Sequence, residues 1–530
     1  MTNIALRLNG QEKYKEAEAM HRETLTLRRR VLGDKHPDTL TSMNDLALLL
    51  QKQGKHGKAG SIHREILTLR RQMLGNEHPD TLMSMNNIAL VLWAQGHYDE
   101  GETMHRETLG LMSRVLGDKH PDRISSMHNL ALVLQKRGRY QEAEALLRET
   151  LALRSQVLGV EHPDVLTSRS NLAALFHDQG KYEDAEAMHR ETVALRRQVL
   201  GDKHPDTLVS MSNLGALFHS KGKYGEAEKM LRDTVILMKQ VLGNEHPDTL
   251  VSLNNLAAVL DDQGKYEVAE AMHCETLALR TQVLGDKHPD TLTSMNNLAA
   301  VLGSQGKYKE AEQMHRGTLA LRRQVLADKH PDTLTTMSNL ALALNSQGNH
   351  KDAEQMHSQT LELCKKVLGM GHPDTLASTN NLALVLHTLG NYERAEQLHR
   401  QTLGHRKELL GQEHPDTLAS LNNLTLVLNS LGRYEETEQM FMQTILLYKK
   451  VLGAEHPDTL TVMSNLALAV QSQGKYEAAE EMYRETLALR RRVLGDKHPD
   501  TRSNINNLAS VLRSQGKYAE AEATCQQSAE

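Results

Sequence analysis

Apolar residues recur along this chain at spacings of three and four, the pattern of amphipathic helices that bury one face. In residues 288–329 a first stripe consists of Leu292, Met295, Leu298, Ala299 and Leu302. A second stripe runs from Tyr308 to Leu326, and Gly306 lies between the two. The segment therefore predicts two antiparallel helices joined by a tight turn. We find no stretch with the period of two that indicates a half-buried strand.

The ends of the predicted helices carry their own signals. Pro289 opens the first helix at a position where its missing N–H costs no hydrogen bond. Asp290 places a negative charge in the first turn, where the helix dipole favours it. Glycine closes most second helices, as at Gly285 and Gly495, although Ala327 replaces it in this segment. Each helix pair is thus predicted to begin at a proline and to end at a glycine.

The same 42-residue pattern fills the whole chain. A His-Pro-Asp triplet begins every copy, and all 12 prolines of the protein lie in these triplets. We number the copies as units 1 to 12, from the triplets at His36, His78, His120, His162, His204, His246, His288, His330, His372, His414, His456 and His498. A fixed period without insertion or deletion predicts stacked copies that cover one another's apolar faces in a solenoid.

We divide the chain into a partial unit at 1–35, eleven complete units at 36–497 and a partial unit at 498–530. Neither end carries an obvious polar capping helix, which solenoids use to remain soluble. Three interpretations stay open. The chain is a fragment of a longer protein, its uncapped ends are covered by a partner or by self-association, or its end helices fray without consequence.

The motifs within each unit resemble the tetratricopeptide repeat. The residues that carry the resemblance are Leu298, Ala299, Leu302, Gly306, Tyr308, Ala311 and Leu319. The usual repeat has 34 residues, and this longer form is similar to the kinesin-light-chain type, which also occurs in nephrocystin-3-like proteins and fungal nucleotide-binding receptors. The resemblance implies an all-α fold, a right-handed α-solenoid or superhelix of stacked antiparallel helix pairs.

The resemblance also implies a class of function. We expect a non-enzymatic scaffold or adaptor that binds peptides or helices of partner proteins in a concave groove. The alternative is the ligand-sensing repeat region of a larger NB-ARC or NACHT-type signalling ATPase. The sequence contains neither the heptad segment of kinesin light chains nor a P-loop motif, G-x-x-x-x-G-K-[ST]. Motor binding and nucleotide binding are therefore not carried over.

Composition narrows the classes of partner. A net charge of −5 over 530 residues gives no basic excess of the kind that nucleic-acid-binding surfaces show. The longest apolar run, Ile88 to Ala94, is far too short to span a bilayer. Cys274, Cys364 and Cys525 lie far apart in the array and indicate a reducing compartment. We expect protein or peptide ligands, no nucleic acid, no membrane and a cytoplasmic location.

Histidines recur in two series, and we interpret both as structural. The triplet histidines mark helix starts, and equivalent loops of neighbouring units lie about 10 Å apart, too far to share a metal ion. The second series lies in the second helices, at His21, His63, His105, His189, His273, His315, His357 and His399. Other units place Leu, Phe or Tyr there, as expected of a packing position. No residue breaks the repeat as a catalytic site would, so we predict no metal, no cofactor and no enzyme activity.

Asparagine pairs in the first helices are the main candidates for a binding surface. We predict that the second residue of each pair, such as Asn297, forms hydrogen bonds between neighbouring helices. By the resemblance, the first residue faces the concave groove, where its amide can bond to the backbone of an extended peptide. The candidate groove asparagines are Asn44, Asn86, Asn254, Asn296, Asn380, Asn422 and Asn506.

Positions further along the first helices vary more than the rest of the unit. Trp93 occupies one of them, and Asp178, Asp261 and Asp262 make the middle of the groove acidic and lined by small residues. We expect a basic or neutral extended segment to bind there. A solvated cluster of charges without a ligand is the alternative.

Overall fold

The computed structural model describes residues 4–5 and 13–526, and the elements of these residues are all helices. The first helices of units 1 to 12 are α3 (Pro37–Lys52), α5 (Pro79–Ala94), α7 (Pro121–Lys136), α9 (Pro163–Asp178), α11 (Pro205–Ser220), α13 (Pro247–Asp262), α15 (Pro289–Ser304), α17 (Pro331–Ser346), α19 (Pro373–Thr388), α21 (Pro415–Ser430), α23 (Pro457–Ser472) and α25 (Pro499–Ser514). The second helices of the same units are α4 (His56–Leu74), α6 (Tyr98–Val115), α8 (Tyr140–Leu158), α10 (Tyr182–Leu200), α12 (Tyr224–Val241), α14 (Tyr266–Leu284), α16 (Tyr308–Leu326), α18 (His350–Val367), α20 (Tyr392–Leu409), α22 (Tyr434–Val451), α24 (Tyr476–Leu494) and α26 (Tyr518–Gln526), and α2 (Tyr14–Leu32) precedes them.

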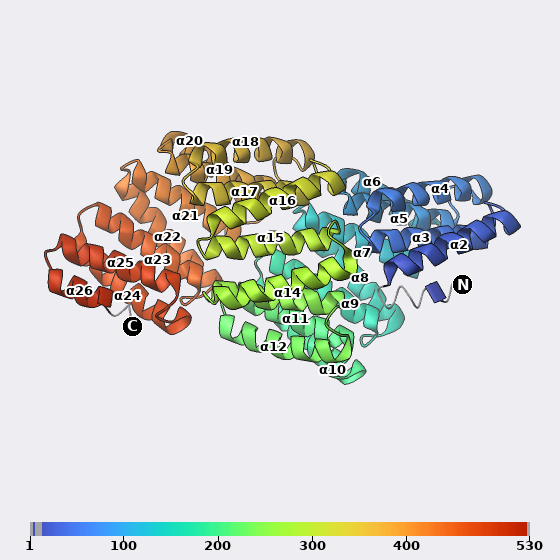
Figure 1. The fold of residues 1–530 in the computed structure, drawn as a ribbon, viewed down its shortest axis with the longest axis horizontal. Helices are drawn as coiled ribbons and strands as arrows, with labels where there is room; N and C mark the ends of the chain where they lie inside the picture. Colours follow the sequence, from blue (N-terminus) through green and yellow to red (C-terminus); the bar gives the residue numbers. More distant parts are fainter. Residues whose placement is uncertain (1–3, 6–12, 527–530) are drawn as a thin grey trace.

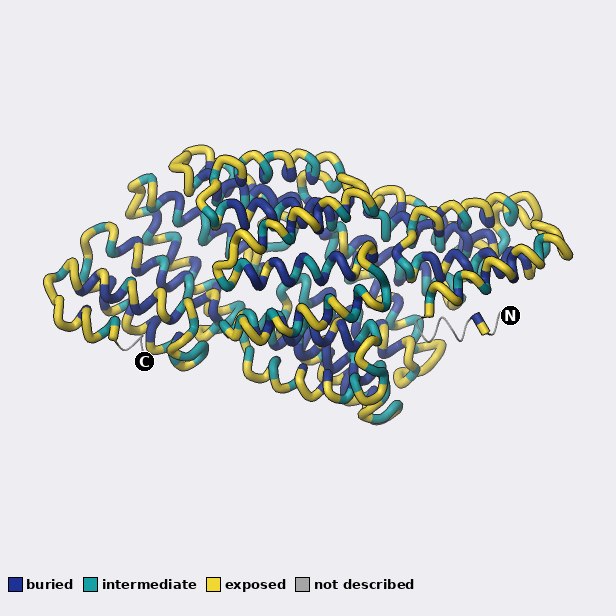
Figure 2. The backbone as a smooth tube through the Cα atoms, viewed as in Figure 1, coloured by how far each residue is buried: buried dark blue, intermediate teal, exposed yellow. Residues whose placement is uncertain are grey.

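The helices form one coiled array, as predicted. Each first helix packs between the second helix of its own unit and that of the unit before, and the chain winds from α2 at one end to α26 at the other (Figure 1). The second helices form the outer rim and carry most of the exposed surface (Figure 2). The all-α solenoid is therefore confirmed. Most of residues 1–12 and all of 527–530 lie outside the described residues, and the unit boundaries stay a prediction.

The core is a continuous layer between the two helix types. In unit 7 the first helix, α15, buries eight side chains, among them Leu292, Leu298 and Leu302. Its second helix, α16, buries five, including Ala311 and His315. The first helix buries more because neighbouring helices cover it on both sides, which explains why its apolar stripe is the broader one.

Each first helix begins with a histidine cap. In all twelve units Nδ1 of the triplet histidine accepts a hydrogen bond from the N–H of the aspartate two residues later, at 3.1 to 3.2 Å. The histidine backbone is extended, as at an N-cap position. The sequence predicted a helix start here, and the structure adds that the imidazole satisfies one of the unpaired N–H groups.

Successive turns of the coil touch each other, which the sequence did not predict. Nε2 of His288 lies 3.0 Å from the carbonyl oxygen of Lys52, the last residue of α3, six units earlier. Five more pairs repeat this contact at the same separation of 236 residues, with distances of 2.8 to 3.3 Å: His330 with Ala94, His372 with Lys136, His414 with Asp178, His456 with Ser220 and His498 with Asp262. We call this row of contacts the inter-turn seam.

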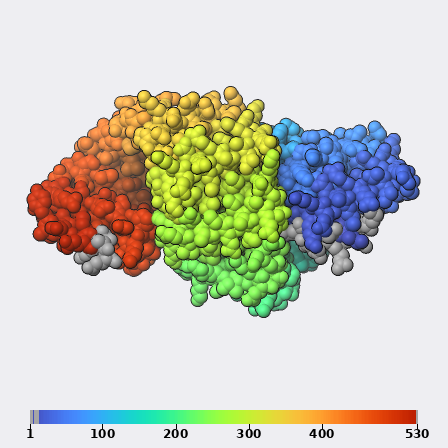
Figure 3. All heavy atoms as spheres, in the orientation of Figure 1, coloured from blue at the N-terminus to red at the C-terminus, as the bar shows by residue number. Residues whose placement is uncertain are grey.

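The seam also requires glycine on its other side. The turn after α9 contains Gly180 at φ +71°, and a Cβ atom there would lie 2.4 Å from Cδ of Pro415. The turns at Gly54, Gly96, Gly138, Gly222 and Gly264 approach the triplet of a later unit in the same way, with a Cβ contact of 2.4 to 3.2 Å to the proline. In the space-filling view the yellow-green middle units lie directly against the blue N-terminal units (Figure 3).

The histidines of the second helices are core residues, as predicted. His63, His105, His357 and His399 are fully buried, and neither ring nitrogen has a hydrogen-bond partner. Burial lowers the pKa of each of them to about 4. Because the neutral imidazole is the form that packs, the folded chain resists protonation that the unfolded chain accepts near pH 6.5.

Replacing His357 with leucine, the residue found at Leu231, should make the array more resistant to acid. The wild-type stability of this site is present above pH 6.5 and is lost as the pH falls towards 4, by about 2 kcal/mol at pH 5. The urea midpoint should therefore fall less between pH 7 and pH 5 in His357→Leu than in wild type. The same change at the partly exposed His405 is the control, and equal acid sensitivity of all three proteins would contradict the assignment.

Replacing Ala327 with glycine should stabilise unit 7. Ala327 has φ 76° and ψ 166°, a region that is costly for any residue with a side chain, and it is the one non-glycine residue with positive φ among the described residues. We expect Ala327→Gly to raise the free energy of unfolding by about 1 kcal/mol. Gly285→Ala, where an added Cβ meets no atom within 4 Å, should lower it by a similar amount through backbone strain alone.

Candidate functional site

The asparagine pairs form a ladder between neighbouring first helices. Nδ2 of Asn297 donates to Oδ1 of Asn254 at 2.7 Å, and most of the other second asparagines contact the unit before them in the same way. Five more asparagine pairs have distances of 3.1 to 3.4 Å: Asn87 with Asn44, Asn129 with Asn86, Asn339 with Asn296, Asn423 with Asn380 and Asn465 with Asn422. The predicted structural role of the second asparagine is confirmed.

The ladder also fixes the first asparagines, the candidate groove residues. Their Oδ1 atoms accept from the next unit, and no described residue accepts from the Nδ2 groups of Asn44, Asn254, Asn380 and Asn422, which are half-buried. Asn86 and Asn296 are more deeply buried, at 5 % and 8 % exposure. Asn506 is exposed and takes part in no such pair among the described residues. Four side-chain amides are therefore held in place by their oxygen atoms, and each has two N–H groups that can donate to a ligand.

Serine replaces the first asparagine in four units, and two of these serines keep the ladder contact, whereas Oγ of Ser170 and of Ser464 has no hydrogen-bond partner among the described residues. Oγ of Ser212 accepts from Asn255 at 3.4 Å, and Oγ of Ser338 accepts from Asn381 at 3.2 Å. In unit 3 the ring of His128 contacts Asn171 instead. The ladder thus needs an acceptor at this position but not an amide, so the amide N–H groups are extra to the ladder.

The candidate aspartates are engaged within the chain and do not form one acidic patch. Gln135 donates to Asp178 at 2.8 Å, and the ring of His177 lies 3.3 Å from it. Burial alone would raise the pKa of Asp178, but these two hydrogen bonds outweigh it and the pKa is lowered. Asp178 therefore remains ionised, although its charge is shared with neighbours.

Asp261 and Asp262 lie elsewhere and differ from each other. His219 contacts the carboxylate of Asp262 at 2.6 Å. Ser304 donates to Asp261 at 3.2 Å, yet burial, together with the charge of Asp262, raises the pKa of Asp261 to about 6. Both side chains face the unit that follows or precedes them, so the acidic middle consists of separate inter-unit contacts.

Trp93 and Asp178 meet at a cavity that the seam closes. The cavity measures about 590 Å³ and lies between the ends of α5, α7 and α9 and the triplets of units 7 to 9. Its lining includes Trp93, Tyr98, Tyr140, Asp178 and His372, and the rings of Tyr98 and His372 stack at 6.4 Å. The sequence placed Trp93 and Asp178 on an open groove, whereas the next turn of the coil covers them here.

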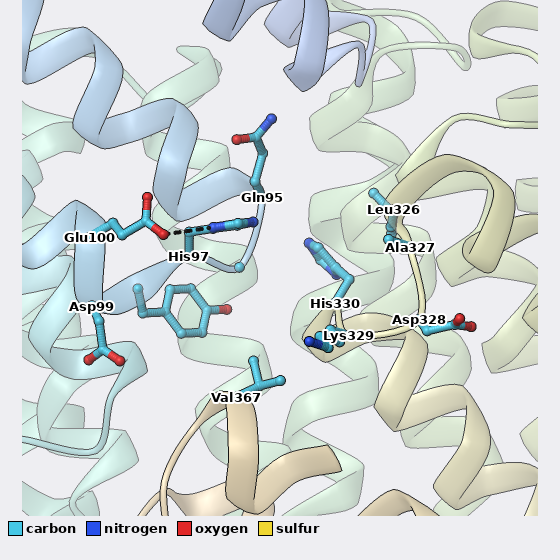
Figure 4. Close-up of a pocket in the computed structure, with 12 residues that line it drawn as sticks. Gln95, His97, Asp99, Glu100, Leu326, Ala327, Asp328, Lys329, His330 and Val367 are labelled. Carbon is cyan, nitrogen blue, oxygen red and sulfur yellow. Dashed lines mark hydrogen bonds and ion pairs between the residues drawn. The ribbon is translucent and has the colours of Figure 1, made fainter.

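A second cavity of about 470 Å³ adjoins the first along the seam. His97 and Glu100 approach it from α6 and its preceding turn, opposite His330 and Lys329 from the triplet loop of unit 8 (Figure 4). His97 and Glu100 are in contact at 3.3 Å. Both cavities thus combine histidine, tyrosine and acidic groups from units six positions apart.

One exposed apolar surface was missed in the sequence. Met442 and Leu446 on α22 are 56 % and 69 % exposed, beside a cavity of about 240 Å³ that Met463 and Met482 help to line. The equivalent residues of unit 7 are Arg316 and Ala320. This break in the repeat pattern was the available signal, because a hydrophobic residue on an otherwise charged outer face is unusual.

In residues 4–5 and 13–526, no three His, Cys, Asp or Glu side chains converge as a metal site requires. No helix in that same part of the chain is both long and apolar enough to cross a membrane.

Comparison with known proteins agrees with the repeat pattern. Profiles described as tetratricopeptide repeat match residues 1–72, 43–112, 80–156, 122–198, 164–235, 249–290, 275–324, 290–366, 332–408, 374–429, 416–492 and 471–530. No curated protein matches the chain. Solved structures that resemble it include a provisionally identified kinesin light chain from Podosopora anserina with nearly identical TPR-like repeats, at 28 % identity, 39 % coverage of this chain, 97 % of that chain and a TM-score of 0.34. BtubC (BKLC) from P. vanneervenii shares 22 % identity over 44 % of this chain and 94 % of its own, with a TM-score of 0.37.

Proposed function

The chain belongs to the tetratricopeptide repeat family, whose fold serves as a protein-interaction scaffold, and we propose that it is a non-enzymatic adaptor that binds extended peptide segments along its first helices. The observation that supports this best is the set of half-buried amides at Asn44, Asn254, Asn380 and Asn422. Each is held by its oxygen within the ladder, which leaves its N–H groups to donate to a peptide carbonyl. Pre-positioned donors bind with less loss of side-chain freedom.

In this proposal the aspartates give the site a preference for positively charged peptides. Asp178 is ionised at neutral pH, and Asp262 is half exposed beside His219. A peptide with lysine or arginine at matching positions would gain from these carboxylates. The alternative is that the aspartates only form contacts between units and bind no ligand. The experiments below distinguish these two roles.

We also propose a cytoplasmic location for the adaptor. Cys274 and Cys364 lie on different helices of the described part of the chain and form no disulfide, as suits a reducing compartment. The alternative function, a ligand-sensing region of a signalling ATPase, would use the same amides, and a nucleotide-binding domain encoded next to the array would distinguish it.

Replacing Asn44, Asn254, Asn380 and Asn422 with serine should weaken peptide binding without disturbing the array. Serine keeps the ladder acceptor, as Ser212 and Ser338 do, but removes the amide donors. Peptides selected against the immobilised chain from a displayed random library serve as probes. A peptide that accepts one hydrogen bond from each of two of these amides should bind about tenfold more weakly in fluorescence anisotropy. Unchanged affinity, with the thermal midpoint also unchanged, would exclude the amides as donors.

Replacing Asp178, Asp261 and Asp262 with asparagine should weaken basic peptides and make their binding less dependent on salt. Screening by salt reduces attraction between exposed charges, so the triple variant should lose much of the salt effect. Wild-type affinity should also fall as the pH drops through about 6, where Asp261 takes up a proton. If affinity and salt dependence stay at wild-type values, the aspartates are contacts within the array only.

A further inference from the structure

We propose that two copies of this chain associate head to tail through the two unpaired halves of the inter-turn seam. Inside one chain the seam has a donor half, the His-Pro-Asp triplets of units 7 to 12, and a receptor half, the glycine turns of units 1 to 6. The triplets of units 1 to 6 repeat the same three residues, and the turns of units 7 to 12 repeat the glycine, but in the described part of the chain neither set faces another turn of the coil. This proposal concerns a different surface from the asparagine ladder and does not depend on peptide binding.

The unpaired triplets are capped and exposed. The side chains of His36, His120, His162, His204 and His246 are 33–40 % exposed, and Nδ1 of each accepts its own aspartate N–H. In the paired half, His288, His330, His372 and His456 are only 5–9 % exposed. Since Nδ1 is an acceptor, the neutral ring carries its proton on Nε2, the donor that the seam uses. The first six units thus present donors in the form that the paired half already uses.

The unpaired turns offer the matching receptor. An added Cβ at Gly306, Gly348, Gly390, Gly432, Gly474 or Gly516 would meet no atom within 4 Å, and these glycines keep the positive φ of their paired equivalents. Next to them stand the last carbonyl groups of α15, α17, α19, α21, α23 and α25, which are helix C-termini in need of donors. Tyr308, Tyr434 and Tyr518 after these turns are exposed, at 36 %, 39 % and 71 %.

The two halves match in number, order and spacing. Six triplets at one end and six turns at the other both repeat every 42 residues, and each already fits its counterpart within the chain. Each contact joins the negative end of one helix dipole to the positive end of another, as α3 meets α15. A second copy placed as the next turn of the coil, one unit further along so that its α2 stacks on α26, would repeat five of these contacts, between its triplets of units 1 to 5 and the turns of units 8 to 12. The occupant is therefore a second copy, since this interface already exists between copies of the unit.

The resulting interface is heterologous, so it does not close on itself. After pairing, one copy would keep its triplet half free and the other its turn half, and further copies could add to either end. The association should therefore grow with concentration, giving a series of oligomers instead of a single closed dimer. This behaviour separates the seam from a two-fold contact between identical surfaces.

Two sets of substitutions block the halves one at a time. The first set replaces His78, His120 and His162 with asparagine. The helix caps are retained, because asparagine is among the best N-cap residues, but the Nε2 donors are removed. The second set replaces Gly390, Gly432 and Gly474 with asparagine. Asparagine tolerates positive φ better than other residues with a side chain, and its side chain would occupy the space where the triplet of the second copy must lie. Neither set touches the seam inside the chain, so the thermal midpoint and helical content of both variants check that the monomer fold is intact.

Sedimentation velocity and light scattering of the full chain, from about 1 to 200 µM, should show wild-type oligomers of increasing size, because weak heterologous interfaces lie in this affinity range. Each blocked variant alone should stay a monomer at concentrations at least tenfold higher. A mixture of the two should form a 1:1 dimer and no larger species, since it retains one intact pair of halves.

Three outcomes would overturn the proposal. The wild-type chain could remain a monomer throughout the range, or its oligomers could be unaffected by both sets of substitutions, which would place the association at the uncapped ends. Alternatively, the wild type could form a closed dimer whose size does not grow with concentration. In that case the contact is two-fold and the seam halves are not paired between copies.

Discussion

The imidazole at the start of each unit is the contact on which this coil depends. One nitrogen caps its own helix, and in units 7 to 12 the other reaches the last carbonyl of a helix six units earlier. A single side chain thus satisfies the N-terminus of one helix and the C-terminus of another, which works only as the neutral Nε2–H tautomer. A lysine or arginine could not accept at the cap, and an aspartate could not donate across the seam. The chemistry of histidine therefore explains why this residue, and not the usual serine or aspartate cap, opens every unit.

The seam also accounts for the strict length of the repeat. In a solenoid where each unit touches only its neighbours, an extra loop residue is tolerated because its effect remains local. Here every contact joins residues 236 positions apart, so one insertion would shift all later triplets relative to the turns they face. The turns are constrained as well, because Gly180 and its equivalents leave no room for a side chain beside the proline. The repeat length is thus held by the pitch of the coil and not only by stacking.

The sequence predicted what lies within a unit and between neighbours, and it missed what depends on the whole coil. Helix starts, glycine turns, the buried histidines and the pairing of the second asparagine follow from local patterns, and they are confirmed. The seam could not be predicted in this way, because the spacing between turns of the coil depends on small rotations added over six units. No single motif encodes those rotations. For the same reason Trp93 and Asp178 were expected on an open groove and lie instead at a cavity between turns. Met442 and Leu446 depart from the repeat pattern, and this departure is the one local signal of the exposed apolar surface.

The seam and the ladder divide the first helices between two tasks. The ladder joins the middle of most first helices to the next unit, while the seam joins one end of each first helix to another turn. A ligand at the middle therefore meets amides whose positions are already fixed from both directions. Contact between turns of the coil also reduces access to the surface near Trp93. The proposed peptide site is therefore more rigid but less open there. Units whose turns have no triplet against them, from Gly306 onwards, keep the more open approach. Binding of an extended segment is then expected to favour the later units, whose amides at Asn380 and Asn422 combine a fixed oxygen with an uncovered neighbouring turn.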